Sequence, residues 1–202
     1  FGYITNFGKA HLEGFGGTEG VIKGKSELYE YLSSNHKTAF INSDDAIQNE
    51  KTTNINRITF GFNNPENFVN ITKIETNPMV KIEFEDTTIQ SHLIGLYNAN
   101  NINAAITIGK HFGVSNEKIK FGLENYIPNN NRSQLLEKNS NKIILDAYNA
   151  NPSSMNAALT NFFQLEEKNK VAILGDMFEL GIESSDEHKK LIEFCFHNEN
   201  II

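Results

Sequence analysis

An imidazole and a carboxylate lie two residues apart near the start of the chain, at His11 and Glu13. They belong to a glycine-bearing loop that follows an expected strand end at residues 3–5. A neutral histidine nitrogen can bind a divalent metal ion. A single loop histidine is more often simply solvated, so these residues alone leave both interpretations open.

Two further pairs of polar residues stand on expected helices. Lys25 and Glu27 lie on a helix expected over residues 18–32, where charged side chains are usually solvated. Asn98 and Asn101 are three residues apart at the start of another helix, so they face the same side and can offer amide groups to a nucleobase. Asn98 can equally cap that helix.

The second half of the chain holds polar side chains that suit phosphate and ligand binding. Arg132 carries a guanidinium fork that matches phosphoryl oxygens. Asp146 is expected at the carboxyl end of a parallel strand, the edge at which open α/β sheets place ligand-binding groups. Tyr148, Asn149 and Asn151 follow in the next loop with groups that can form hydrogen bonds.

The elements that must position the first of these residues alternate between helix and strand. A short strand is expected at residues 38–42, followed by a helix that begins at Asp44 or Asp45. From about residue 55 to residue 93 the pattern changes to strands, which include an antiparallel hairpin of residues 80–84 and 87–93. We expect these strands to form a small secondary sheet.

The next segments predict two domains, residues 1–130 and 131–202. Helices are expected at residues 98–112 and 116–124, and the Pro-Asn-Asn-Asn run at residues 128–131 has the composition of a linker. The alternation beyond it is typical of a parallel, Rossmann-like sheet. Its segments are a strand at 142–146, a helix at 152–163, a strand at 170–175 and a helix at 185–197.

Length, composition and charge limit the function classes. The 202 residues are 39% hydrophobic with a formal net charge of −7 and one cysteine, which excludes a disulfide framework. An acidic chain is a poor partner for nucleic acid or an anionic membrane surface, because both require clustered Lys and Arg. No apolar run approaches the roughly 20 residues needed to cross a bilayer, so we expect a cytoplasmic protein that acts on small molecules.

Several motifs, in this order along the chain, resemble the ATP-dependent Mur ligases of peptidoglycan synthesis. Residues 4–20 read I-T-N-x-G-x-A-H-L-E-x-F-G-x-x-E-G, and Lys-Ser-Glu-Leu follows at residues 25–28. Residues 95–105 carry G-x-Y-N-x-x-N-x-x-A-A, and residues 131–134 read Asn-Arg-Ser-Gln. Asn131 departs from the family pattern, in which a glycine commonly precedes the arginine. Arg132 itself is kept, so the departure affects the expected geometry of the loop and not its charge.

The loop at residues 146–152, Asp-Ala-Tyr-Asn-Ala-Asn-Pro, together with Gly-Asp-Met-Phe-Glu-Leu-Gly at residues 175–181, indicates a group within the family. Both resemble the members that add D-alanyl-D-alanine to UDP-N-acetylmuramoyl-tripeptide. The alternatives are another Mur-type or folylpolyglutamate-type amide ligase, and a nucleotide-binding relative that has lost catalysis. A monomer is expected.

The resemblance implies a reaction and a set of roles. ATP phosphorylates the tripeptide carboxylate, and the amine of the dipeptide attacks the acyl phosphate, with Mg²⁺ and cationic side chains offsetting the phosphate charge. The implied catalytic residues are Lys25, His11 and Arg132, and the implied metal ligands are His11 and Lys25, the latter if it is carbamylated. The implied ATP-binding residues are Asn98, Asn101, Arg132 and Asp146, and the implied substrate-binding residues are Tyr148, Asn149 and Asn151.

The phosphate-binding motif G-x-x-x-x-G-K-[ST], which the family needs, does not occur in these residues. The resemblance places it upstream of Phe1, so the chain is expected to be a fragment at both ends and to have no ligase turnover alone. It would comprise the second half of a central ATPase domain, with a small antiparallel sheet, and a truncated Rossmann-like C-terminal domain. Residues 200–202 resemble the start of a further strand.

Overall fold

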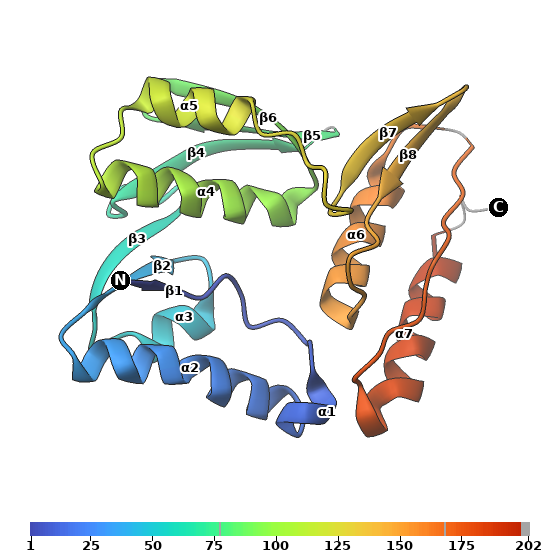
Figure 1. Ribbon diagram of the computed structural model, residues 1–202, viewed down its shortest axis with the longest axis horizontal. Coiled ribbons are helices and arrows are strands. Elements are labelled where there is room, and N and C mark those ends of the chain that lie inside the picture. Colours follow the sequence, from blue (N-terminus) through green and yellow to red (C-terminus); the bar gives the residue numbers. More distant parts are fainter. Residues whose placement is uncertain (77, 168, 199–202) are drawn as a thin grey trace. The chain divides into compact units, whose positions relative to one another are not determined.

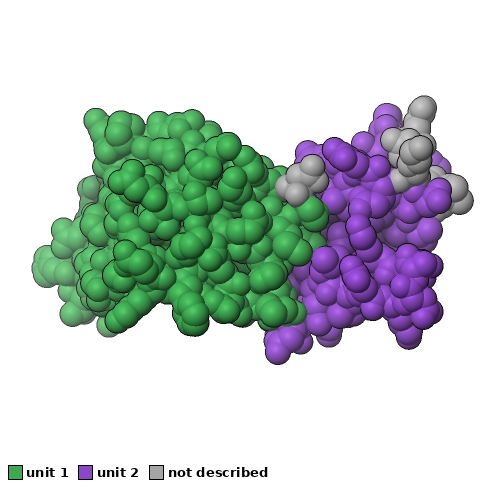
Figure 2. Space-filling model, turned by 90° about the horizontal axis from the view of Figure 1, so that it is seen from above, with its two compact units in different colours: residues 1–7, 25–128 green, residues 8–24, 129–202 purple. Residues whose placement is uncertain are grey.

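The structure is a computed structural model that describes residues 1–76, 78–167 and 169–198. The chain divides into two compact units, which are described separately and coloured in Figure 2. Unit 1 comprises residues 1–7 and 25–128, and unit 2 comprises residues 8–24 and 129–202. Residues 8–24 thus group by their contacts with the second half of the chain, and the domain limits 1–130 and 131–202 stay a prediction.

Unit 1 is built on one six-stranded sheet whose strands follow one another in chain order (Figure 1). Neighbouring strands are parallel from β1 to β4 and antiparallel from β4 to β6. The strands are β1 (Gly2–Tyr3), β2 (Thr38–Asn42), β3 (Asn56–Phe62), β4 (Val69–Thr76), β5 (Met79–Phe84) and β6 (Thr87–Ile94).

The predicted hairpin is confirmed as β5 and β6, but the expectation that it belongs to a separate small sheet is wrong. β4 pairs in parallel with β3, with Phe60 opposite Val69, and both side chains are buried. Pairing β4 with β3 places both side chains in the same core. Because β5 pairs with β4, the hairpin extends the main sheet. The small antiparallel sheet lies instead in unit 2.

Helices cover the sheet and position the candidate residues of unit 1. They are α2 (Thr18–Ser34), whose first turns belong to unit 2, α3 (Ala46–Lys51), α4 (Leu96–His111) and α5 (Asn116–Glu124). The expected start of α3 is confirmed, because the Asp45 carboxylate accepts hydrogen bonds from the backbone of Ile47 and Gln48. Apolar residues of α4, among them Ala99, Ile102 and Ile106, pack on the sheet side chains.

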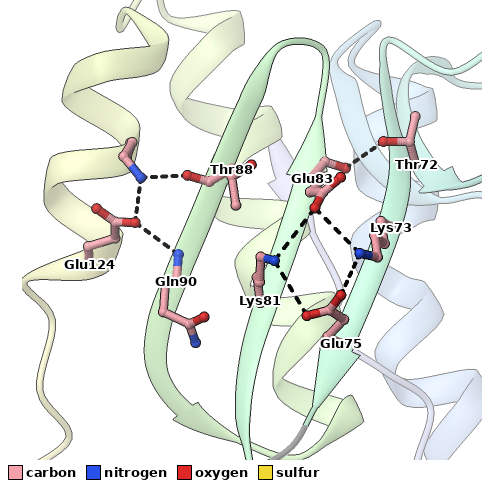
Figure 3. Close-up of polar contacts among 9 residues, drawn as sticks. Thr72, Lys73, Glu75, Lys81, Glu83, Thr88, Gln90 and Glu124 are labelled. Atoms are coloured by element: carbon pink, nitrogen blue, oxygen red, sulfur yellow. Dashed lines mark hydrogen bonds and ion pairs between the residues drawn. The ribbon is translucent and has the colours of Figure 1, made fainter.

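The exposed face of the antiparallel part of the sheet carries alternating charges (Figure 3). Lys73 lies 2.5 Å from Glu75 and 3.8 Å from Glu83, and Lys81 lies 3.5 Å from Glu75 and 3.7 Å from Glu83. Exposed pairs of this kind contribute little stability. They keep one face of the strands polar while residues such as Ile82 fill the core on the other.

Two side chains of α5 close the free edge of β6. The Glu124 carboxylate accepts a hydrogen bond from the backbone N–H of Gln90 at 2.9 Å (Figure 3). The Lys120 ammonium donates to the carbonyl of Thr88 at 2.5 Å. An open strand edge is a template for pairing with another chain. These two contacts occupy the backbone N–H of Gln90 and the carbonyl of Thr88, which could otherwise pair with another strand.

The described residues of unit 2 form one hairpin and two main helices. β7 (Gln134–Lys138) and β8 (Asn141–Leu145) pair antiparallel, α6 spans Pro152–Gln164 and α7 spans Ser184–Phe196. The short helix α1 (Leu12–Phe15) and a 3₁₀ turn (Gly181–Glu183) complete it. Leu12, Val21, Met177 and Leu180 form its small buried core.

The mixed α/β class is confirmed, and the two predicted helices of the second half are α6 and α7. The strand predicted at residues 170–175 is wrong, because those residues are not assigned to a strand and Ile173 is 93% exposed. A strand requires a hydrogen-bonded neighbour, and β8 pairs only with β7 among the described residues. The strand expected at residues 200–202 lies outside the described residues.

None of the helices in the described ranges has the length and apolar character that crossing a bilayer requires.

The Ile82→Ala substitution tests the core of unit 1. Ile82 is fully buried, so the change should lower the free energy of unfolding by about 2–5 kcal/mol. Lys73→Ala on the exposed face of the adjacent strand is the matched control and should leave that free energy nearly unchanged. Urea denaturation measures both, and equal losses for the two variants would contradict the assignment of the two faces.

Candidate functional site

His11 lies in an unusual backbone conformation at the start of α1. Its φ of 55° and ψ of 35° are left-handed, and its side chain is 56% exposed. The Nδ1 atom of its ring contacts the Oε2 atom of Glu179 directly. The backbone supports this contact, because the N–H of Glu13 donates to the carbonyl of Glu179 at 2.9 Å.

Burial of apolar side chains holds the Glu179 loop against the His11 loop. Leu12, Met177 and Leu180 are each no more than 3% exposed and pack together. Glu179 also has a positive φ, 60°, a conformation that a non-glycine residue adopts only when its surroundings stabilise it. Because Nδ1 faces a carboxylate, the Nε2 atom of His11 is the nitrogen left for another partner.

The sequence does not predict the role of Glu179, whose type and position have an ordinary surface interpretation. Its only signal is membership of the motif at residues 175–181. A second contact fixes the same loop: His188 Nε2 lies 2.7 Å from Asp176, and its Nδ1 lies 2.7 Å from the carbonyl of Ser184. The hydrogen bond to that carbonyl has the largest effect and raises the pKa of His188. The hydrogen bond to Asp176 raises the pKa further.

Lys25 belongs to unit 1 and is half-buried on α2. Its ammonium donates a hydrogen bond to the carbonyl of Asn6 at 2.9 Å. Burial lowers the pKa of Lys25, since an apolar environment disfavours the charged form. At a given pH, the neutral fraction of Lys25 is therefore larger than that of an exposed lysine.

Asn98 and Asn101 lie together, as their spacing indicates. The amide of Asn101 donates to the side-chain oxygen of Asn98 at 3.2 Å, and the amide of Asn98 donates to the carbonyl of Ile94 at 2.8 Å. Asn98 is not the N-cap, because α4 begins at Leu96 and Gly95 precedes it. Asn98 is 8% exposed whereas Asn101 is exposed, so Asn101 is the amide that a base can reach.

Arg132 stacks on Tyr148. The guanidinium carbon lies 3.9 Å from the centroid of the tyrosine ring, a cation–π contact that leaves the guanidinium edge free for hydrogen bonding. Asp146 accepts a hydrogen bond from the hydroxyl of Ser133 at 3.3 Å. The hairpin β7–β8 therefore brings Arg132, Asp146 and Tyr148 to one end of unit 2.

The departure at Asn131 has a structural explanation. Asn131 has a φ of 57°, a left-handed conformation that glycine adopts freely and that asparagine tolerates better than most residues. Its carbonyl accepts a hydrogen bond from Ala147 at 2.8 Å. Asparagine can therefore replace the usual glycine without changing the course of the loop before Arg132.

Asn149 and Asn151 have their amide oxygens engaged locally. The Asn151 oxygen accepts from the backbone of Ser154 at 2.9 Å, and the Ser154 hydroxyl accepts from the backbone of Asn151 at 3.1 Å, which makes a capping box for α6. The Asn149 oxygen accepts from the backbone of Ala150 at 2.9 Å. The amide nitrogens and the second lone pair of each oxygen are the groups with which these side chains would contact a substrate.

The donors present suit a metal ion that keeps external ligands. Within the described ranges, no group of three or more His, Cys, Asp or Glu side chains lies close enough to enclose a metal. Mg²⁺ commonly binds through one or two protein ligands together with water and substrate phosphates. His11 in unit 2 and Lys25 in unit 1 are described separately, and their roles as ligands stay a prediction.

Comparisons with known proteins agree on a family. Two family descriptions match this chain: "Mur ligase middle domain" over residues 1–109 and "Mur ligase, glutamate ligase domain" over residues 131–197. A UDP-N-acetylmuramoyl-tripeptide--D-alanyl-D-alanine ligase from Bacillus subtilis is 31% identical over 93% of this chain and 41% of its own length. The ligase of the same name from Escherichia coli is 31% identical over 94% of this chain and 44% of its length.

Solved structures give the same result. A crystal structure of MurF from Acinetobacter baumannii aligns with a TM-score of 0.80 at 30% identity, over 94% of this chain and 42% of that one. The MurF ligase of Thermotoga maritima, solved in complex with ADP, aligns with a TM-score of 0.78 at 25% identity, over 93% and 44%. This chain spans about two fifths of the length of these relatives. Since the middle-domain match alone covers more than half of its 202 residues, the chain belongs to the Mur ligase family.

Proposed function

We propose that the full-length protein is an ATP-dependent ligase that adds D-alanyl-D-alanine to UDP-N-acetylmuramoyl-tripeptide. The observation that carries this proposal is the Asp-Ala-Tyr-Asn-Ala-Asn-Pro loop at residues 146–152. Relatives named for this reaction match over almost the whole chain, which supports it. A cytoplasmic, monomeric enzyme with a domain boundary at residues 130/131 remains part of the proposal.

The proposed chemistry has two steps. A carboxylate oxygen of the tripeptide attacks the γ-phosphorus of ATP, forming an acyl phosphate and releasing ADP. The dipeptide amine then attacks the acyl carbon, the amide C–N bond forms, the C–O bond breaks, phosphate leaves and the amine loses a proton. Phosphoryl oxygens gather negative charge in both steps, so cationic partners must be held in position.

Arg132 is the cationic side chain best prepared for this role. Its stacking on Tyr148 restricts the guanidinium before a nucleotide arrives, and a restricted group loses less entropy on binding. Asp146 lies on the neighbouring strand end, and on α4 the oxygen of the buried Asn98 accepts a hydrogen bond from the exposed amide of Asn101. We assign these four residues to the nucleotide, and Tyr148, Asn149 and Asn151 also to the acceptor substrate.

His11 and Lys25 are the proposed ligands of Mg²⁺, which would offset phosphoryl charge when bound. The lowered pKa of Lys25 favours the neutral amine, the form that reacts with CO₂. Its nitrogen forms a bond to carbon and releases a proton, and the resulting carbamate presents oxygen atoms that suit a hard cation. His11 would use Nε2, since its Nδ1 faces Glu179.

ADP release by the full-length protein tests the reaction. With UDP-N-acetylmuramoyl-tripeptide and ATP, release should require D-alanyl-D-alanine and yield the amide product. Release that requires a single amino acid instead would indicate another amide ligase of this family. Absence of turnover with any acceptor, while ATP still binds, would indicate a non-catalytic relative.

Lys25→Ala should lower kcat strongly in the full-length enzyme. Loss of a residue that supports a metal ligand costs about 10–100-fold, and loss of the proposed ligand itself should cost at least as much. Short-chain carboxylates should restore part of the rate, because they can supply the missing oxygen ligand. Lys23→Ala, an exposed lysine on the same helix, is the control and should stay near wild type. A normal kcat in Lys25→Ala, or no response to any carboxylate, would contradict the carbamate role.

Glu179→Ala should weaken metal binding without removing a metal ligand. The carboxylate holds His11 through Nδ1, and loss of such a partner typically costs about 10–100-fold in metal affinity. Titration of Mn²⁺ by electron paramagnetic resonance, with ATP present, measures the affinity. In a His11→Ala background the same change should have no further effect. An undiminished affinity in Glu179→Ala, or full additivity in the double variant, would show that Glu179 does not act through His11.

A further inference from the structure

Unit 2 contains a hollow of about 500 Å³ that none of the assigned roles uses. It lies between the first half of α6 and α7, and Lys9 from the His11 loop forms part of its wall. The backbone N–H of Lys9 donates to the hydroxyl of Ser153 at 2.8 Å, which fixes the loop against α6. Pro152, the last residue of the loop at residues 146–152, also lines the hollow. The hollow therefore adjoins the loop that we assign to the acceptor substrate.

The charges that line the hollow are unevenly matched. Lys9 and Lys190 each place an ammonium nitrogen 2.9 Å from the same oxygen, Oε1 of Glu187. Glu187 is only 6% exposed, whereas the side chains of Lys9 and Lys190 are 39% and 64% exposed. Two ammonium groups share one carboxylate, so the cluster keeps a net positive charge and spare N–H donors.

Glu187 stays ionised in this position. Burial alone would raise the pKa of its carboxyl, but the hydrogen bonds from Lys190 and Lys9 outweigh that effect and lower the pKa. Its Oε1 atom accepts a hydrogen bond from each ammonium group at 2.9 Å. The buried carboxylate thus keeps both ammonium groups at the same side of the hollow.

The remaining wall is small and largely apolar. Pro152, Ala157 and Leu191 supply apolar surface, Asn156 supplies an amide, and Ser153 supplies the hydroxyl that Lys9 contacts. Methyl groups and one peptide group fit such a wall, whereas a polyphosphate would leave its oxygens against apolar carbon. A single net positive charge likewise matches a carboxylate better than the several charges of a nucleotide phosphate chain.

We propose that this hollow is the subsite for the carboxylate end of the D-alanyl-D-alanine acceptor, with Lys190 and Lys9 as its cationic partners. This inference rests on the proposed function and adds to it a location for one end of the acceptor. The two methyl groups would contact Ala157 and Leu191. Glu187 is a positioning residue, since it acts on the ligand only through the two lysines.

A cycle that changes both the lysine and the ligand tests the subsite in the full-length enzyme. The acceptors are D-alanyl-D-alanine and its C-terminal amide, which lacks the negative charge. The wild type should prefer the acid in kcat/KM by about tenfold or more, the range expected for a charged hydrogen bond in a partly buried site. Lys190→Ala should lose most of that preference through a higher KM for the acid, with the KM for ATP unchanged.

Matched variants separate binding from folding. Lys189→Ala removes a neighbouring exposed lysine that pairs with Glu193 at 3.9 Å and does not line the hollow, so it should keep the wild-type preference. Ala157→Leu should fill the hollow and raise the KM for both acceptors. Thermal denaturation of each variant shows whether it remains folded.

The outcomes distinguish this inference from the proposed function. If the wild type ligates the dipeptide but Lys190→Ala keeps the full preference for the acid, the subsite is wrong and the ligase function stands. A change in the KM for ATP alone would assign the lysines to a nucleotide phosphate and would also overturn the subsite. If the wild type ligates neither acceptor, the proposed function fails and the subsite fails with it.

Discussion

The burial of Leu12 against Met177 and Leu180 is the interaction on which the candidate site of unit 2 depends. Leu12 follows His11 directly, and Met177 and Leu180 flank Glu179, so packing these apolar side chains fixes two polar ones. The hydrogen bond between the backbones of Glu13 and Glu179 then sets the register of the two loops. The direct contact of His11 with Glu179 follows from this arrangement. It costs little additional conformational entropy, because the backbone of both residues is already fixed. Without the apolar core, both polar side chains would be solvated and independent.

Much of the local structure could be predicted because its causes are local. The apolar run of β2, the Asp45 cap of α3 and the turn between β5 and β6 are each encoded within a few residues. The sheet to which the hairpin belongs is decided by the pairing of β4 with β3, which depends on shared burial and not on either strand alone. The apolar residues at 171–174 show the same limit, since an apolar run becomes a strand only beside a partner.

The candidate site was predictable to a different degree at each residue. The three-residue spacing of Asn98 and Asn101 implies their contact, because helix geometry fixes it. No spacing implies the contact of His11 with Glu179 or of Lys9 with Glu187, since 168 and 178 residues separate the partners. Asn151 is a third case. Its residue type indicates hydrogen bonding to a ligand, whereas in the structure its side-chain oxygen caps the N-terminus of α6.

The closure of the β6 edge by α5 has a consequence for the synthesis of the protein. The ribosome completes β6 at Ile94 and reaches Glu124 thirty residues later. At about 5–20 residues per second, this interval lasts roughly 1.5 to 6 s. During that time the backbone groups of Thr88 and Gln90 have not yet met the side chains that occupy them in the folded chain. The rate of translation therefore sets how long this strand edge stays open to neighbouring nascent chains.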